Sequence, residues 1–235
     1  MPGGAIAFSR VASPSSRPLC FLKESYNRPP SFIEGAVFAT AELLWALIGL
    51  ILTIGATWLE MFITSFPWLW SGQGIEVVSL GVSFQVGAVL LTGCLGGQNA
   101  AALAQIAYLS LGIVLFQTFD LQVFTQGGGL SYFREPSFGY LLGFIPAAWV
   151  CGFWAFNTAP SLENLAFGSL GGLLVLHTAG LAYLLLAYLL SWVGPQAPTM
   201  ASAVVAYSLA PLPGQLAIVC VVALLAYGIR RVMFY

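Results

Sequence analysis

The stretch "VVSLGVSFQVGAVLLTGCLGGQNAAALAQIAYLSLGIVLFQ" (Val77–Gln117) consists of two apolar runs separated only by the turn "GGQN" (Gly96–Asn99). Each run has about the 20 residues that a helix needs to cross a bilayer. Because the separator is short and contains two glycines, it predicts a tight turn between helices. The stretch therefore predicts two transmembrane helices, at 77–96 and 99–117, joined as a hairpin.

Four further apolar runs of similar length flank this hairpin on both sides, at 36–60, 138–157, 165–193 and 201–230. The last run contains "PLPG" (Pro211–Gly214), and proline cannot continue the hydrogen-bond ladder of a helix. We therefore expect a short helix over Thr199–Leu209 and a main span over Gln215–Arg230. The predicted fold is an all-α integral membrane protein with six transmembrane helices.

The composition supports a lipid environment and excludes several functions. Hydrophobic residues make up 59% of the chain and charged residues 6%, against about 25% charged residues in soluble domains. A net charge of −1 argues against nucleic acid as a partner, because phosphate binding needs a basic excess. A single histidine, and four cysteines without metal-site or redox spacing, predict no metal and no cofactor; we interpret the cysteines as buried small apolar residues.

Enzymatic motifs are missing from the sequence, which contains no G-x-S-x-G, no H-E-x-x-H and no P-loop. A small membrane enzyme would have to use Glu42 and His177 as a catalytic pair. Glu42 lies near a helix start, where the helix dipole favours a carboxylate without any catalytic role. His177 lies within a span, where it either has a function or bonds to a neighbouring helix. We predict that the chain is not an enzyme and has no catalytic residue.

The distribution of charge predicts the domains and the orientation. Residues 1–34 are polar and rich in proline and serine, which predicts a disordered tail, a transit segment or an overlong gene start, ahead of a six-helix membrane domain at 35–235. The two ends of the chain carry six Lys/Arg, whereas the loops on the other side carry only Arg134. This bias predicts a multi-pass protein of the cell membrane with both termini in the cytoplasm.

Polar residues near the predicted outer face are candidates for a binding site. Gln85 follows "GVSF" near the start of the second span, and Gln215 follows the proline break, where backbone groups are freed and must face protein or a wet cavity. The outer loop 118–137 contains Tyr132, Arg134 and three consecutive glycines, which allow close approach and movement. Arg134 either attracts an anionic solute or is solvated beside Glu135.

Five segments together resemble the BioY family, the biotin-binding S-components of energy-coupling factor (ECF) transporters. They are "GVSFQVGAVLLTGCLGG", "AQIAYLSLGI", "QVFTQGGGLSYFREPSFGYLLGFIPAA", "GGLLVLHTAGLAYL" and "PLPGQLAIVCVVALLA", in this order. The most specific part is "PSFGYLLGF" (Pro136–Phe144). The stretch "ELLWALIGLILTIGATWLE" (Glu42–Glu60) is similar to cyanobacterial members.

This resemblance implies a six-helix S-component-like bundle with an outward-facing biotin pocket. It implies that Gln85, Gly139, Tyr140 and His177 occupy family binding positions. With Tyr132, Arg134 and Gln215, they form the predicted substrate-binding set. It also implies a T-subunit and ATPase subunits as partners. At the head of the sixth span, Gln215 and Ile218 stand where the family usually has Asp and Lys.

The sequence therefore predicts a membrane-embedded substrate-binding component for uptake of biotin or a closely related small vitamin, energised by separate ATPase and T subunits. The alternative is a structural membrane subunit that has kept this scaffold and lost transport. The changes at Gln215 and Ile218 favour that alternative.

Overall fold

A computed structural model of the chain describes residues 32–64, 77–124, 127–193 and 198–233. Residues 39–235 form one compact unit, and residues 1–38 form a second unit, of which only the helical backbone from Phe32 is described. Most of the predicted tail, 1–34, lies outside the described residues, so its disorder stays a prediction.

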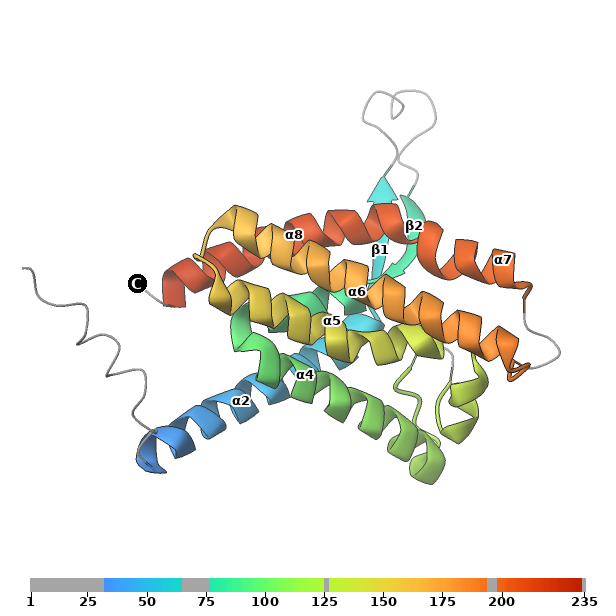
Figure 1. Ribbon diagram of the computed structural model, residues 1–235, viewed down its shortest axis with the longest axis horizontal. Coiled ribbons are helices and arrows are strands. Elements are labelled where there is room, and N and C mark those ends of the chain that lie inside the picture. The colour runs from blue at the N-terminus through green and yellow to red at the C-terminus, as the bar shows by residue number, and fades with distance from the viewer. Residues whose placement is uncertain (1–31, 65–76, 125–126, 194–197, 234–235) are drawn as a thin grey trace, which may run out of the picture. The chain divides into compact units, whose positions relative to one another are not determined.

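Five long helices dominate the described chain (Figure 1). They are α2 (Phe32–Thr57), α4 (Gln85–Phe119), α5 (Phe138–Asn157), α6 (Leu162–Leu189) and α8 (Leu212–Met233). The shorter elements are β1 (Glu60–Thr64), β2 (Val77–Ser83), the 3₁₀ turn η2 (Leu130–Arg134), α7 (Met200–Val204) and the π-helix η3 (Val205–Leu209). Helix α4 contacts α5 and α8, and α6 contacts the same two helices, so these four close into a ring.

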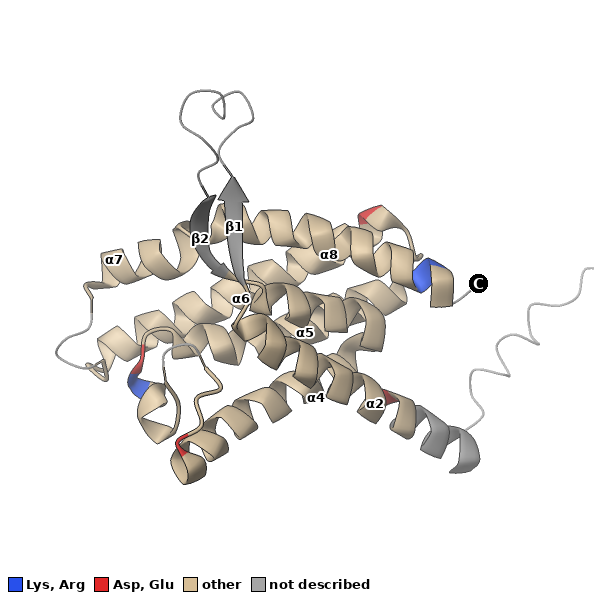
Figure 2. Ribbon diagram, turned by 180° about the vertical axis from the view of Figure 1, so that it is seen from behind, with Lys and Arg blue, Asp and Glu red and all other residues tan. Residues whose placement is uncertain are grey.

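The surface of these helices fits a bilayer. All five described long helices have the length and apolar composition to cross a membrane, when α7, η3 and α8 are taken as one stretch, Met200–Met233. Large apolar side chains such as Ile51, Leu174 and Leu224 are exposed on the outside. Figure 2 shows that most of the described charges lie at helix ends or in the loops between them; Glu42 is the exception, inside α2. The prediction of a helical, multi-pass membrane protein is confirmed.

The prediction of six separate spans is wrong by one, because strand β2 and a short first arm of α4 take the place of the second predicted span. Gly97 interrupts α4 with φ 82° and ψ 175°. In a straight helix Gln85 and Tyr108 would lie about 34 Å apart, yet their side chains are hydrogen-bonded at 2.8 Å. The chain therefore reverses at Gly97, as the glycine-rich turn predicts. The first arm, 85–96, is only about 18 Å long, too short to cross a bilayer by itself.

The first arm is short because the residues before it form a strand. Strands β1 and β2 pair antiparallel, with Glu60 opposite Ser83 and Thr64 opposite Val77, and an irregularity between Glu60 and Phe62. Valine is β-branched and fits an extended backbone better than a helix, and β2 contains three valines. The purely helical prediction for 77–84 is therefore wrong, and the rest of the connection, 65–76, lies outside the described residues.

The proline break takes the form of a π-helix. The backbone N–H of Ala210 donates to the carbonyl of Val205, five residues earlier, at 2.8 Å. Helix α8 then begins at Leu212, three residues before the predicted start of the main span, because proline is tolerated in the first turn of a helix. The helical path therefore changes at this point without a full break.

Small residues hold the helices close together near the Gly97 turn. A Cβ added to Gly152 on α5 would lie 2.5 Å from the backbone nitrogen of Gln98. Next to it, the thiols of Cys94 and Cys151 are buried 3.5 Å apart, beside the hydroxyl of Ser169. Burial of these two cysteines agrees with the prediction, whereas Cys220 is exposed on α8, facing outward from the ring.

Candidate functional site

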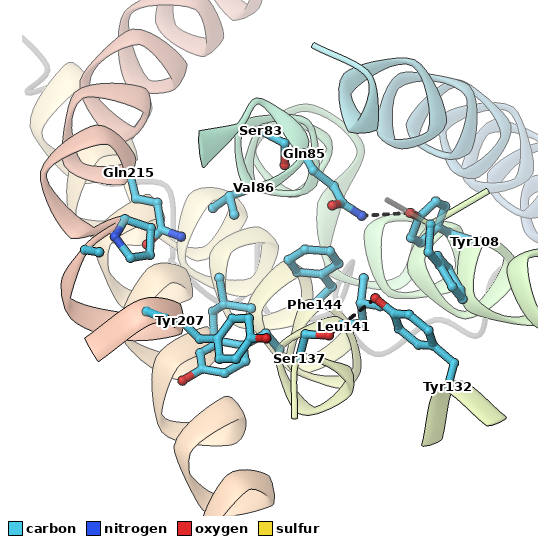
Figure 3. Close-up of a pocket in the computed structure, with 16 residues that line it drawn as sticks. Ser83, Gln85, Val86, Tyr108, Tyr132, Ser137, Leu141, Phe144, Tyr207 and Gln215 are labelled. Atoms are coloured by element: carbon cyan, nitrogen blue, oxygen red, sulfur yellow. Dashed lines mark hydrogen bonds between the residues drawn. The ribbon is translucent and has the colours of Figure 1, made fainter. Parts of the chain in front are cut away.

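A cavity of about 500 Å³ opens between the starts of α4 and α5, the second arm of α4, the middle of α6 and the junction of η3 with α8. This volume is in the range of small-molecule sites, about 300–1,000 Å³. Its described lining consists of Ser83, Gln85, Val86, Tyr108, Phe124, Tyr132, Ser137, Tyr140, Leu141, Phe144, Leu176, Ala206, Tyr207, Ala210, Pro211 and Gln215 (Figure 3). Most of these side chains are aromatic, amide or hydroxyl groups.

Gln85 supplies one polar wall of the cavity. It is the first residue of α4 and is 7% exposed. Its Nε2 donates to the hydroxyl of Tyr108 at 2.8 Å, and this hydroxyl lies 3.2 Å from Oγ1 of Thr57 on α2. In Figure 3 the amide nitrogen of Gln85 points to Tyr108 and the amide oxygen points the other way. The network therefore orients Gln85 so that it presents an acceptor to the cavity.

Gln215 lies on the opposite wall of the cavity and offers a donor where Gln85 offers an acceptor. It lies in the first turn of α8 and is 6% exposed. Its Oε1 is 2.7 Å from Nε2 of His177 on α6. An amide oxygen can only accept, so His177 donates through Nε2–H. With its oxygen held from behind, Gln215 presents its amide nitrogen, a donor, to the cavity (Figure 3).

His177 lies behind the cavity wall. It is buried on α6, at 8% exposure, and its ring meets that of Tyr140 edge-on with 6.0 Å between centroids. Its Nδ1 is buried without a hydrogen-bond partner among the described residues. Because His177 does not line the cavity, its contact with a ligand would be made through Gln215.

Tyrosines from α5, η2 and η3 form the aromatic part of the lining. The hydroxyl of Tyr140 is 2.6 Å from Oγ of Ser208, and the ring of Tyr140 is 6.0 Å from that of Tyr207. The hydroxyl of Tyr132 is 3.4 Å from Oγ of Ser137. Burial raises the pKa of Tyr132, so its phenol stays protonated and able to donate at neutral pH.

The structure brings together most of the predicted substrate-binding set. Gln85, Tyr132, Tyr140 and Gln215 line one cavity, and His177 bonds to Gln215. Gly139 is buried against the ring of Tyr183 and leaves no room for a Cβ, which indicates a packing position. Arg134 is exposed on η2 and is not part of the lining. The binding roles of all seven residues stay predictions.

The predicted glycine loop leads to η2. Gly127 and Gly129 have positive φ angles of 116° and 72°, which glycine adopts without strain. Gly128 and Gly129 pack against the side chain of Phe116 on α4. Gln126 lies outside the described residues, and the movement of the loop stays a prediction.

Several lining residues were missed by the sequence reasoning. Tyr108 lies three residues after Gln105, so both lie on one face of a helix, and both are fully buried. Polar side chains within a membrane segment usually face the protein interior, and this spacing could have identified Tyr108. The apolar context of Phe144 and Tyr207 carries no such signal, because aromatic residues are common in membrane helices.

The sequence model of the BioY family matches residues 70–234. The chain belongs to the BioY family. BioY proteins are transporter components and not enzymes, so membership confirms the predicted family resemblance and the prediction of a non-enzymatic transport protein.

Individual relatives agree with this assignment. The chain is 31% identical over 191 residues to an uncharacterised 21.2 kDa protein of Cyanophora paradoxa, covering 81% of this chain and 95% of the relative. It is 35% identical over 106 residues to the "Probable biotin transporter BioY" of Lysinibacillus sphaericus, which is 45% of this chain and 52% of that protein.

A solved structure shares the fold. The S-component for biotin from an ECF-type ABC transporter superposes with a TM-score of 0.56 at 17% identity, covering 86% of this chain and 94% of that one. This match confirms the predicted S-component-like bundle.

Proposed function

We propose that this BioY protein is the membrane-embedded substrate-binding component for uptake of biotin or a closely related small vitamin. The observation that carries the proposal is the pair of buried amides in one cavity. Gln85 is tied to Tyr108 and Gln215 to His177, so one amide offers an acceptor and the other a donor.

The ureido ring of biotin matches this arrangement. Its carbonyl is an acceptor for the amide nitrogen of Gln215, and its N–H groups are donors for the amide oxygen of Gln85. The thioether ring fused to it offers an apolar surface that can lie among Phe144, Tyr140 and Tyr207, which line the same cavity. A few fixed polar groups in an aromatic pocket are what a small-molecule site requires.

This sequence has no P-loop, so it cannot hydrolyse ATP by that route. We propose a T-subunit and ATPase subunits of the ECF type as partners. We also propose that the protein lies in the cell membrane with both termini in the cytoplasm. In that orientation Arg230 and Arg231 lie at the inner end, as the positive-inside rule requires, and the cavity opens outward. Arg134, exposed on η2, would then attract an anionic solute to the mouth.

Binding of labelled biotin to the purified full-length chain tests the proposal. We expect saturable binding at micromolar biotin or below, measured beside a bacterial BioY protein as the positive control. Gln85→Leu should weaken binding about ten- to a hundredfold, because it leaves a ligand donor unpaired. Gln117→Leu, the same change at an exposed position, should have no effect. Absence of binding by the unmodified chain would end the proposal.

The partners need a separate experiment, which also addresses the structural-subunit alternative. The chain would be purified from native membranes under mild conditions, and its companions identified by mass spectrometry. Recovery of ATPase subunits supports an energised transporter. Stable companions without any ATPase would instead favour the structural role.

A further inference from the structure

The described lining of the cavity carries no formal charge. The 16 residues that line it include no Asp, Glu, Lys, Arg or His. The chain has only seven Lys and Arg: Arg10, Arg17, Lys23, Arg28, Arg134, Arg230 and Arg231. The internal segments outside the described residues, 65–76, 125–126 and 194–197, contain none of them. Any lysine or arginine that meets a bound ligand must therefore come from this short list.

The two C-terminal arginines lie at the end of the bundle opposite the cavity. Nη1 of Arg230 donates to the carbonyl of Ala155 at 2.8 Å, and its guanidinium lies 4.5 Å from the ring centroid of Phe156. Ala155 is near the end of α5, whereas the lining residue Tyr140 is near its start. These positions are about 22 Å apart along the helix. Arg230 therefore anchors the closed end and does not face the cavity.

Arg134 is the one described cation at the cavity end. It lies two residues after the lining residue Tyr132 and is itself exposed. Its neighbour Glu135 is also exposed and opposes the attraction of an anion. An ion pair in such a solvated position changes affinity by no more than about fivefold. A carboxylate moved into this interior would instead lose its hydration and meet only neutral hydroxyl and amide partners, with no charged one.

Resting on the function proposed above, we propose that the site selects an uncharged cyclic-urea ring and leaves the carboxylate of the ligand at the mouth, in water. The ring enters between Gln85 and Gln215, and the acid tail points toward η2. The substrate class is therefore wider than the free acid. It includes neutral derivatives in which the carboxylate is capped, such as an amide or an ester.

The test compares the affinities of the purified full-length chain for biotin, biotinamide and biotin methyl ester at pH 7. Biotin and the two capped forms are expected to agree within about tenfold. A preference for the free acid of more than about tenfold overturns the inference, because it requires a buried cationic partner.

Two matched variants localise the acid. Arg134→Gln should weaken binding of biotin by no more than about fivefold and leave biotinamide unchanged, whereas Glu135→Gln should slightly strengthen binding of biotin only. A larger loss for Arg134→Gln, or an equal loss with biotinamide, contradicts the placement of the acid at the mouth.

The outcomes separate this inference from the proposed function. If biotin binds and its capped forms do not, the inference fails and biotin binding stands. If neither form binds while the control protein binds biotin in parallel, the proposed function itself fails. Methylation of the ureido nitrogens should abolish binding of acid and amide alike; retained binding would overturn recognition of the ring by the two amides.

Discussion

The same helices behave differently at the Gly97 turn and at the cavity end. Around Cys94 and Cys151, the helices are separated by glycine, alanine and serine, and Gly152 has no room for one more carbon atom. Around Gln85 and Gln215, the helices carry aromatic and amide side chains that line a cavity of about 500 Å³. Small side chains therefore bring the helices together, and large ones keep a space open.

The difference teaches how a membrane protein keeps a polar cavity from collapsing. Each amide in the cavity is bonded to a residue behind it, Gln85 to Tyr108 and Gln215 to His177. Neither amide bonds to the other, so half of each remains available to a ligand. The tight packing around Gly152 makes the helices rigid. The hydrogen bonds to Tyr108 and His177 orient the amides of Gln85 and Gln215.

The largest effect is expected from one methyl group added where Gly152 packs against the Gly97 turn. Gly152→Ala places a Cβ 2.5 Å from the nitrogen of Gln98 and 2.6 Å from the carbonyl carbon of Gly97, and backbone atoms cannot move aside cheaply. We expect a loss of about 1–3 kcal/mol or more in stability, seen as a lower midpoint of thermal unfolding in detergent. The matched control is Gly228→Ala, where no atom lies within 4 Å. An unchanged midpoint for Gly152→Ala would show that the helices are not tightly packed there.

In the cavity, Gln215→Leu removes the donor that faces the ligand. It also leaves Nε2–H of His177 without its acceptor. We expect biotin affinity to fall about ten- to a hundredfold, measured by equilibrium binding, while the protein still elutes as a single species. Leucine of similar volume keeps the wall filled, so unchanged affinity would mean that the ligand does not use this wall.

His177→Phe tests whether the histidine acts only through Gln215. Without the hydrogen bond, the amide of Gln215 is free to rotate, and we expect about a tenfold loss of affinity. In the Gln215→Leu background, the same change should have no further effect on affinity, because the two residues act as one unit. Thr178→Val, at an exposed neighbouring position, is the control. Additive losses in the double variant would indicate direct contact between His177 and the ligand.

The smallest expected effect concerns the aromatic wall. Tyr140→Phe keeps the ring and removes the hydrogen bond to Ser208. We expect affinity to change by no more than about fivefold in the same binding assay. A loss as large as that of Gln215→Leu would mean that the Tyr140 hydroxyl binds the ligand directly.

Sequence alone predicted the helices, the glycine turn and much of the cavity, for identifiable reasons. The helices could be predicted because a helix that crosses lipid needs a long apolar run. The turn could be predicted because a reversal needs a positive φ, which Gly97 adopts. Gln85 and Gln215 were conspicuous because amides are rare in such runs. The strand at Val77–Ser83 was missed because an apolar run of this kind does not distinguish a strand from a helix. The position of His177 behind Gln215 depends on helix rotation, which the sequence pattern does not specify.

The π-helix η3, Val205–Leu209, has a consequence for the origin of the cavity. A π segment accommodates one residue more than the regular turn it replaces, and one residue corresponds to about 100° of rotation around a helix axis. A chain shorter by one residue would swing Tyr207 and Ser208 to a different azimuth relative to α8. Insertion of a single residue is therefore enough to orient Tyr207 and Ser208 as they stand at the cavity, and deletion of that residue would turn them away from it.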